Sequence, residues 1–316
     1  MMTGSRNWTV STPEEKGMDP GKLRLMDRVI YAKYPNLLSC LIVRDGSIVY
    51  ERYYRNIGPD DPLPVMSVNK SVLSALIGIA LEKGILTNLD QLVLEFFPEV
   101  HTHDVNPQTR RLTLRHLLTM TSGFYYPRLT GDAQPIWQRT ALSRNWTEFS
   151  LKLPVRDAMG RYFNYKNTDA HLAAACLSRA SGKPIGELAE KWLFQPLGMK
   201  VPYWEADDPQ KLGIGTLYMT ARDMAKFGQL YLQSGRWGDH RIISEEWVTA
   251  STSRHIGRYG YFWWIEEDGF SASGAGGTLI RVIPAQRIVT VFQSKHLNRF
   301  KDPREIVDRH VIPATH

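Results

Sequence analysis

Residues 65 to 84, VMSVNKSVLSALIGIALEKG, place a serine and a lysine three positions apart at the start of an apolar run. The run predicts a helix that begins near Ser67, ends before Gly84 and is apolar around most of its circumference, so we expect it to be buried. Lys70 then lies one turn after Ser67, where an ammonium group is costly to bury unless it is paired or neutralised. Burial disfavours the charged form of an amine, and a neutral amine can accept the proton of a serine hydroxyl. The pair therefore predicts a serine nucleophile at the positive end of a helix dipole, where a developing oxyanion is stabilised.

A structural interpretation of the same helix also exists. The residues that share the face of Lys70 are small or polar: Ser67, Ser71, Ser74 and Gly78. A stripe of this kind lets another helix pack closely. That explains the serines and the glycine, but it does not explain the lysine.

Other catalytic signatures are absent from the sequence. It contains no G-x-S-x-G, H-E-x-x-H, C-x-x-C, G-x-G-x-x-G or P-loop pattern. A serine activated by a lysine needs neither a cofactor nor a metal, so we expect none. His116 and Ser122 offer a serine–histidine alternative, but His116 falls in the predicted helix LTLRHLLTM and is expected to be structural.

The two ends of the chain are rich in strand patterns. LSCLIV and SIVYERYY flank Asp45-Gly46, a strong hairpin signal, and YGYFWWI, TLIRVI and RIVTVF follow near the other end. Helices are expected after Asp19-Pro20 and after Asp302-Pro303. The middle shows apolar residues at helical spacing. We therefore predict an α+β fold: residues 1–64 and 251–316 form an antiparallel sheet flanked by terminal helices, and residues 65–250 form an inserted, mostly helical domain that carries the nucleophile.

Composition narrows the class of partner. The net charge is +7, but the lysines and arginines are scattered, so we expect a small-molecule substrate and no nucleic acid. The longest apolar run, residues 72–81, is too short to cross a bilayer, and the N-terminus lacks the apolar segment of a signal peptide. These features predict a protein of the cytoplasm that does not bind a membrane. They do not indicate an oligomeric state.

Several longer phrases accompany S-x-x-K: LRHLLTMTSGF at 114–124, YMTARDMAKFGQLYLQSGRW at 218–237 and YGYFWWI at 259–265. With them the chain resembles the serine β-lactamase and D-alanyl-D-alanine peptidase superfamily. It is most similar to class C β-lactamase-like esterases and 6-aminohexanoate-dimer hydrolases. The resemblance extends from the Asp45-Gly46 hairpin to RIVTVF. It implies the α/β/α sandwich of that superfamily and an acyl-enzyme on the serine.

The resemblance also implies a Tyr-x-Asn motif after the nucleophile. Two of the three matches, Tyr34–Asn36 and Tyr54–Asn56, precede Ser67 and are interpreted as turn residues. The third, Tyr165–Asn167, lies in a loop that leads into a helix, as the family requires. Tyr165 is then expected to pass a proton to the leaving group, and Asn167 to hydrogen-bond the lysine and the substrate. Lys166, between them, is expected to be solvated.

The third motif of the superfamily, Lys-Thr-Gly, is replaced here by Ala272-Ser273-Gly274. By resemblance, the backbone of this strand, at Ser273 with an uncertainty of one residue, completes the oxyanion hole with Ser67. Gly274 suits a backbone that approaches a ligand closely. The lysine that would bind the carboxylate of a penicillin is missing, although another Arg or Lys could replace it.

These features together predict a serine hydrolase of a carboxylic ester or small amide, with Ser67, Lys70 and Tyr165 as catalytic residues and Asn167, Ser273 and Gly274 as substrate-binding residues. Two alternatives are a non-catalytic protein that binds cell-wall peptides on the same scaffold, and a weak β-lactamase or D-Ala-D-Ala peptidase. The broken third motif favours the first alternative, and the intact Ser67–Lys70 pair argues against it.

Overall fold

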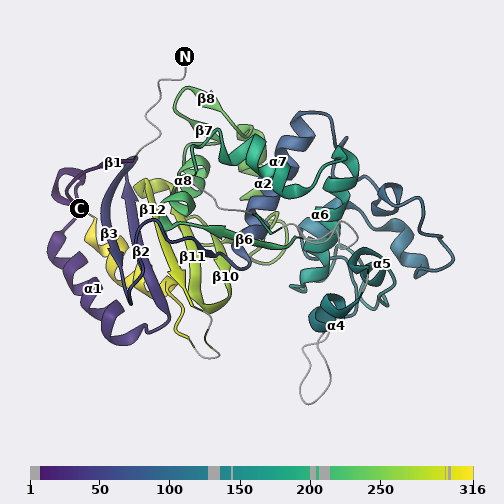
Figure 1. The fold of residues 1–316 in the computed structure, drawn as a ribbon, viewed down its shortest axis with the longest axis horizontal. Helices are drawn as coiled ribbons and strands as arrows, with labels where there is room; N and C mark the ends of the chain where they lie inside the picture. The colour runs from purple at the N-terminus through teal and green to yellow at the C-terminus, as the bar shows by residue number, and fades with distance from the viewer. Residues whose placement is uncertain are drawn as a thin grey trace.

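A computed structural model describes residues 8–126, 136–143, 145–199, 204–205, 214–295, 297 and 300–315. Its sheet has the strand order β1-β3-β2-β12-β11-β10-β9, so that strands from the two ends of the chain lie side by side (Figure 1). Every neighbouring pair is antiparallel except β1 and β3, which makes the sheet mixed at one edge. The predicted sheet from both chain ends is therefore confirmed. The strands are β1 (Thr9–Val10), β2 (Leu37–Arg44), β3 (Ser47–Tyr53), β9 (Trp264–Ile265), β10 (Phe270–Gly274), β11 (Thr278–Ile283) and β12 (Ile288–Ser294).

The hairpin between β2 and β3 turns where the sequence predicted. Asp45 and Gly46 both have positive φ, 48° and 74°, as a two-residue hairpin turn of the right twist requires. Residues of β2 point alternately to two different apolar layers: Leu41 and Val43 to one, Cys40 and Ile42 to the other. Both faces of the sheet are therefore covered, which explains why its central strands are apolar almost throughout.

One face of the sheet is covered by the two ends of the chain (Figure 1). Helix α1 (Pro20–Lys33) begins at Asp19, whose side chain accepts hydrogen bonds from two backbone N–H groups of the first turn. The C-terminal segment comprises α10 (Arg304–Ile306), a π-helical turn (Val307–Val311) and a 3₁₀ turn (Ile312–Ala314). Both elements pack their apolar residues on the sheet, as the sequence predicted.

The other face carries α2 (Val68–Glu82) and α8 (Ala221–Leu232), and α4 (Ile136–Leu142), α5 (Trp146–Leu151) and α6 (Asn167–Ser181) lie beyond α2 (Figure 1). Helix α8 packs on β2, β11 and β12, although it belongs to the stretch assigned to the helical domain. The boundaries of the two predicted domains stay a prediction. The other helices are α3 (Leu114–Leu118), α7 (Ile185–Ala189) and α9 (Glu245–Ser251).

Short elements complete the chain. The π-helical turn Glu190–Phe194 follows α7, and five further 3₁₀ turns span Glu14–Lys16, Val93–Phe96, Pro107–Arg111, Ala275–Gly277 and Pro284–Gln286. Two small sheets join β4 (Leu63–Pro64), β6 (Thr216–Met219) and β5 (Trp204–Glu205), and β7 (Arg236–Trp237) with β8 (His240–Arg241). Among the described residues, no helix has both the length and the apolar character needed to cross a membrane.

The aromatic run at 259–265 is not the continuous strand that its composition predicted. Only Trp264 and Ile265 pair with β10, and Phe262 has a positive φ of 61°. Two tertiary hydrogen bonds hold this bend: the Phe262 N–H donates to the Leu118 carbonyl, and the Ser71 hydroxyl donates to the Phe262 carbonyl at 2.7 Å. The strand propensity of the run is overridden because these contacts satisfy the backbone N–H and C=O of Phe262 without a neighbouring strand.

Candidate active site

Ser67 and Lys70 meet at the N-terminus of α2, as the sequence predicted. Ser67 is the N-cap residue of the helix, and the Lys70 Nζ lies 2.8 Å from its Oγ. Lys70 is 4% exposed, whereas Ser67 is partly exposed, so the hydroxyl is accessible and the amine is enclosed. Gly84 has a positive φ of 68° just beyond the C-terminal end of the helix, which confirms its predicted place.

The turn before the nucleophile is strained and tightly packed. Met66 has a positive φ of 53°, which costs free energy in a non-glycine residue and must be enforced by its surroundings. Strand β10 supplies one such contact, because a Cβ atom built on Gly274 would lie 2.6 Å from the Val65 carbonyl oxygen and 2.9 Å from the Met66 Cβ. The same hypothetical atom would be 3.3 Å from the Ser67 backbone nitrogen. The third-motif strand therefore lies directly against the nucleophile, and only glycine fits at position 274.

Gly274→Ala is expected to lower kcat/KM for an ester substrate by about 100-fold, because the added methyl group must push β10 away from the turn that holds Ser67. Ester kinetics beside thermal unfolding check this. Gly58→Ala is the matched control, since its added Cβ would have no atom closer than 3.8 Å. Equal activity in the two variants would contradict the proposed contact.

Tyr165 lies over the lysine. The Lys70 Nζ is 5.3 Å from the centre of the Tyr165 ring. The ring is stacked on Trp264 with centroids 5.7 Å apart and meets Tyr259 edge-on at 6.2 Å. The aromatic run at 259–265 thus holds the second motif against the first. The structure brings Ser67, Lys70 and Tyr165 together at one end of α2.

Asn167 is the first residue of α6, immediately after this ring. Among the described residues its side chain forms no hydrogen bond with Lys70, so the contact expected from the sequence is not made. Its backbone instead forms a hydrogen bond with the Tyr126 hydroxyl. Burial raises the pKa of that phenol to about 12, and the hydrogen bond from Asn167 opposes the rise. Asn167 therefore lies at the site with its side chain free of the lysine.

The prediction that Lys166 is solvated is wrong. Its side chain is fully buried, and its Nζ lies 3.4 Å from Asp169 Oδ2 and 3.1 Å from Ser122 Oγ. Ser122 Oγ in turn donates to Asp169 Oδ1 at 2.6 Å. Burial raises the pKa of Asp169, while Lys166 and Ser122 oppose that rise. The buried cluster fixes the backbone between Tyr165 and Asn167, because Lys166 points inward while its two neighbours lie at the site.

Lys166→Met is expected to lower the free energy of unfolding by about 3–5 kcal/mol, because it leaves the Asp169 carboxylate buried without its cation. Denaturant unfolding measures the loss. The double variant Lys166→Met/Asp169→Asn removes both charges and should recover much of it. A single variant as stable as wild type would show that the ion pair does not hold this turn.

Ser273 lies on β10 at the edge nearest the site. Strand β9 pairs only with Phe270 and Ser271 of β10, so the edge from Ala272 to Gly274 is not covered by β9. Ala272 is fully buried and lies opposite Ile280 on β11. An uncovered strand edge beside a nucleophile can pair with an extended substrate and supply a backbone N–H to an oxyanion. Ser273 therefore lies on the strand that contacts the turn before Ser67, and its part in an oxyanion hole stays a prediction.

Two histidines of the helical region have structural roles. His116 closes a capping box with Thr113 at the start of α3, which agrees with its predicted role. His171, which the sequence analysis missed, accepts a hydrogen bond from the Ile214 N–H at its Nδ1. Burial, with a smaller effect of Lys70, lowers the pKa of His171 to about 3, so this ring is neutral near pH 7. In the sequence, the only signal for a histidine at this place is the position of His171 one helical turn after Asn167.

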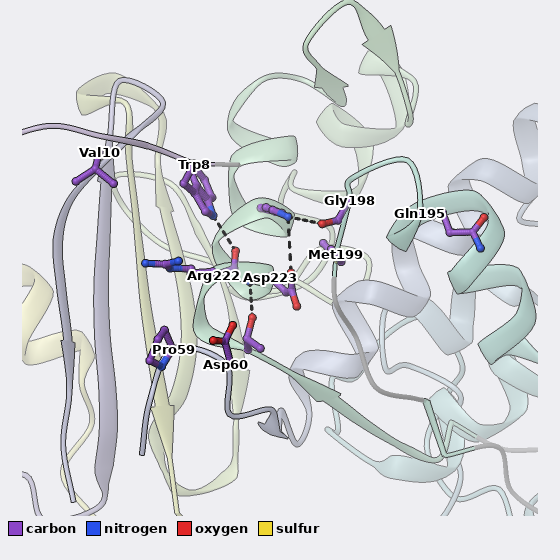
Figure 2. Close-up of a pocket in the computed structure, with 11 residues that line it drawn as sticks. Trp8, Val10, Pro59, Asp60, Gln195, Gly198, Met199, Arg222 and Asp223 are labelled. Carbon is purple, nitrogen blue, oxygen red and sulfur yellow. Dashed lines mark hydrogen bonds and ion pairs between the residues drawn. The ribbon is translucent and has the colours of Figure 1, made fainter. Parts of the chain in front are cut away.

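A separate cavity of about 810 Å³ lies between β1, the N-terminus of α8 and the segment around Gly198 (Figure 2). The Trp8 Nε1 donates to the Arg222 carbonyl, and the Lys226 Nζ donates to the Gly198 carbonyl. The Arg222 side chain forms a two-point ion pair with Glu51. None of the predicted site residues lines this cavity, and no serine or cysteine is among the described residues that do.

Comparisons with known proteins find a family and several relatives. The family model described as Beta-lactamase matches residues 38–312. The chain is 24% identical over 219 residues to the 6-aminohexanoate-dimer hydrolase of Paenarthrobacter ureafaciens, which covers 66% of this chain and 55% of that protein. It is 25% identical over 192 residues to esterase EstB of Burkholderia gladioli, and this match covers 55% of this chain and 48% of that protein. The chain therefore spans about half the length of these curated relatives.

The fold also has solved counterparts. The octameric penicillin-binding protein homologue from Pyrococcus abyssi superposes with a TM-score of 0.72 at 22% sequence identity, covering 95% of this chain and 78% of that one. At this identity the likeness bears on the fold alone.

Proposed function

This chain belongs to the Beta-lactamase family, and on that premise we propose that it is a serine hydrolase that cleaves a carboxylic ester or small amide through an acyl-enzyme on Ser67. The family includes hydrolases of both kinds by name, an esterase and a dimer hydrolase. The observation that carries the proposal is the 2.8 Å contact between the Lys70 Nζ and the Ser67 Oγ at the N-terminus of a buried helix.

The first half-reaction is acylation. The Ser67 oxygen attacks the substrate carbonyl carbon while Lys70 accepts the hydroxyl proton. The negative charge on the carbonyl oxygen develops beside the positive end of the α2 dipole and the edge of β10, where backbone N–H groups stabilise it. The bond to the leaving group then breaks, and the leaving group takes up the proton, with Tyr165 as the group that relays it.

The second half-reaction is hydrolysis of the acyl-enzyme. A water molecule attacks the same carbonyl carbon and gives up a proton to the Lys70–Tyr165 pair. The ester bond to Ser67 breaks, the carboxylic acid leaves, and the serine regains its proton. Each half-reaction uses the same base and the same oxyanion site.

The residue at position 272 supports a preference for short esters and small amides over penicillins as substrates. The family motif has a lysine where this chain has the buried Ala272, so this position supplies no cation for a substrate carboxylate. We expect kcat/KM for p-nitrophenyl acetate and butyrate to exceed that for a cephalosporin by about 100-fold or more, because the carboxylate of the cephalosporin would have no cationic partner at this position.

The test is a panel of these two esters and the cephalosporin. Comparable kcat/KM for both kinds of substrate would reject the ranking. Absence of turnover across the panel, beside saturable binding of a D-Ala-D-Ala peptide, would favour the non-catalytic binding protein instead.

A further inference from the structure

A pocket of about 350 Å³ adjoins the proposed site on the side of β10. It shares two walls with that site: Ser273 on the uncovered strand edge, and Trp264, whose ring is stacked on Tyr165. Its other polar walls are Arg258, Glu266, Asp302 and Arg304. A substrate that lies along the edge of β10 would place one end in this pocket.

Arg304 is the less exposed of the two arginines that line the pocket, and its guanidinium is fully hydrogen-bonded. The Arg304 Nε donates to Glu266 Oε1 at 2.8 Å, its Nη1 to Asp302 Oδ2 at 3.0 Å and its Nη2 to Ser271 Oγ at 3.1 Å. All three nitrogens of the guanidinium therefore have protein acceptors, and the charge is balanced within the wall.

Glu266 also holds two further arginines. Its Oε2 lies 3.1 Å from the Arg258 Nη2, and its Oε1 lies 3.0 Å from the Arg281 Nη1. Arg281 makes a second ion pair with Asp268. Three arginines thus face three carboxylates. Burial and these carboxylates raise the pKa of the neighbouring Asp308, while the charge of Arg281 opposes the rise. The cluster has no excess of positive charge.

Glu266 is the common partner of this cluster and is itself an anion. Burial of its side chain opposes ionisation, but hydrogen bonds from Arg304 and Ser271 and the charge of Arg281 hold its pKa below the usual value. Its side chain is 10% exposed, so its interactions with the largely buried Arg281 and Arg304 are only weakly screened by solvent, whereas the exposed Arg258 is screened more.

We propose that Glu266 determines specificity by making this pocket a subsite for an uncharged part of the substrate. By pairing Arg258, Arg281 and Arg304, it withholds the positive charges that would otherwise attract a substrate carboxylate. The inference rests on the proposed hydrolase function and deepens it: the preferred substrates are esters or amides that are neutral on the side that lies along β10.

The experiment compares matched neutral and anionic esters. One pair differs on the acyl side, p-nitrophenyl butyrate and mono-p-nitrophenyl succinate; the other differs on the leaving-group side, methyl 4-acetoxybenzoate and 4-acetoxybenzoate. The measured quantity is the anionic-to-neutral ratio of kcat/KM. Intrinsic reactivity cancels when this ratio is compared between variants.

Glu266→Gln is expected to raise that ratio by about tenfold in at least one pair, because the amide keeps the shape of the side chain while the arginines gain an unbalanced charge. Glu267→Gln is the matched control: it is the next residue, is exposed and carries the same charge change, so its ratio should equal that of wild type.

A second variant covers the case in which Glu266→Gln does not fold. Asp302 has a half-exposed side chain and holds one nitrogen of the Arg304 guanidinium, while its Oδ1 accepts from the Arg304 backbone N–H. Asp302→Asn removes its charge and should raise the same ratio by a smaller factor. If wild type hydrolyses these esters and the ratio of neither pair changes in the Glu266 and Asp302 variants, this inference is overturned while the hydrolase function stands. If wild type hydrolyses none of the four esters, the proposed function fails and this inference fails with it.

Discussion

Ser67→Ala is expected to lower kcat/KM for p-nitrophenyl butyrate by about 10⁴-fold or more, because it removes the hydroxyl proposed to form the acyl-enzyme. The fold should be unaffected, since Ser67 is partly exposed and its side chain does not cap the helix. The measurement is initial-rate ester hydrolysis beside thermal unfolding.

The control for this variant lies on the same helix. Ser74→Ala removes a hydroxyl from the same face of α2 two turns further on, away from the Lys70 amine. It should keep activity within a few-fold of wild type, because Ser74 touches none of the reacting groups. Turnover by Ser67→Ala at the level of Ser74→Ala would remove Ser67 from the mechanism.

Lys70→Met is expected to lower kcat by about 10²- to 10⁴-fold, the usual contribution of a general base. Methionine keeps the length and most of the volume of the side chain, so the helix should retain its packing. The variant should be at least as stable as wild type, because an enclosed amine is replaced by an apolar group.

Lys70→Arg separates the two ways in which a lysine could act. Arginine keeps a positive charge near the Ser67 oxygen but cannot accept its proton. If Lys70 is the base, the arginine variant should be as inactive as the methionine variant. Near wild-type kcat in Lys70→Arg would show that the charge alone is needed.

Much of the fold follows from local patterns in the sequence. The Asp45-Gly46 turn, the apolar strands on both sides of it and the capped helix after Asp19 were all predicted, because each depends on residues that are close along the chain. The same holds for α2, whose start near Ser67 was predicted from the apolar run and whose end before Gly84 was predicted from a capping preference.

The failures have one physical cause, which is contact between residues far apart along the chain. The run at 259–265 bends at Phe262 because Ser71 and Leu118 bond its backbone, and nothing in the run itself indicates these partners. Lys166 is buried because Ser122, 44 positions earlier, completes its polar cluster with Asp169. Local propensity cannot detect such partners.

The site shows the same division. The spacing of Ser67 and Lys70 predicted their contact, because a helix brings residues at i and i+3 together. The arrangement of Arg258, Arg281 and Arg304 around Glu266 could not be predicted, since these residues come from four different segments. From the sequence we also predict that loops within 124–150 carry substrate specificity, because binding residues are concentrated on loops; residues 127–135 and 144 of that stretch lie outside the described residues.

The most direct measurement is mass spectrometry of the protein quenched during turnover of p-nitrophenyl butyrate, followed by peptide mapping. One butyryl group on the peptide that contains Ser67, absent from Ser67→Ala and present in Ser74→Ala, is the predicted result. Full turnover with no adduct on that peptide, or an adduct that persists in Ser67→Ala, would contradict an acyl-enzyme at the N-terminus of α2.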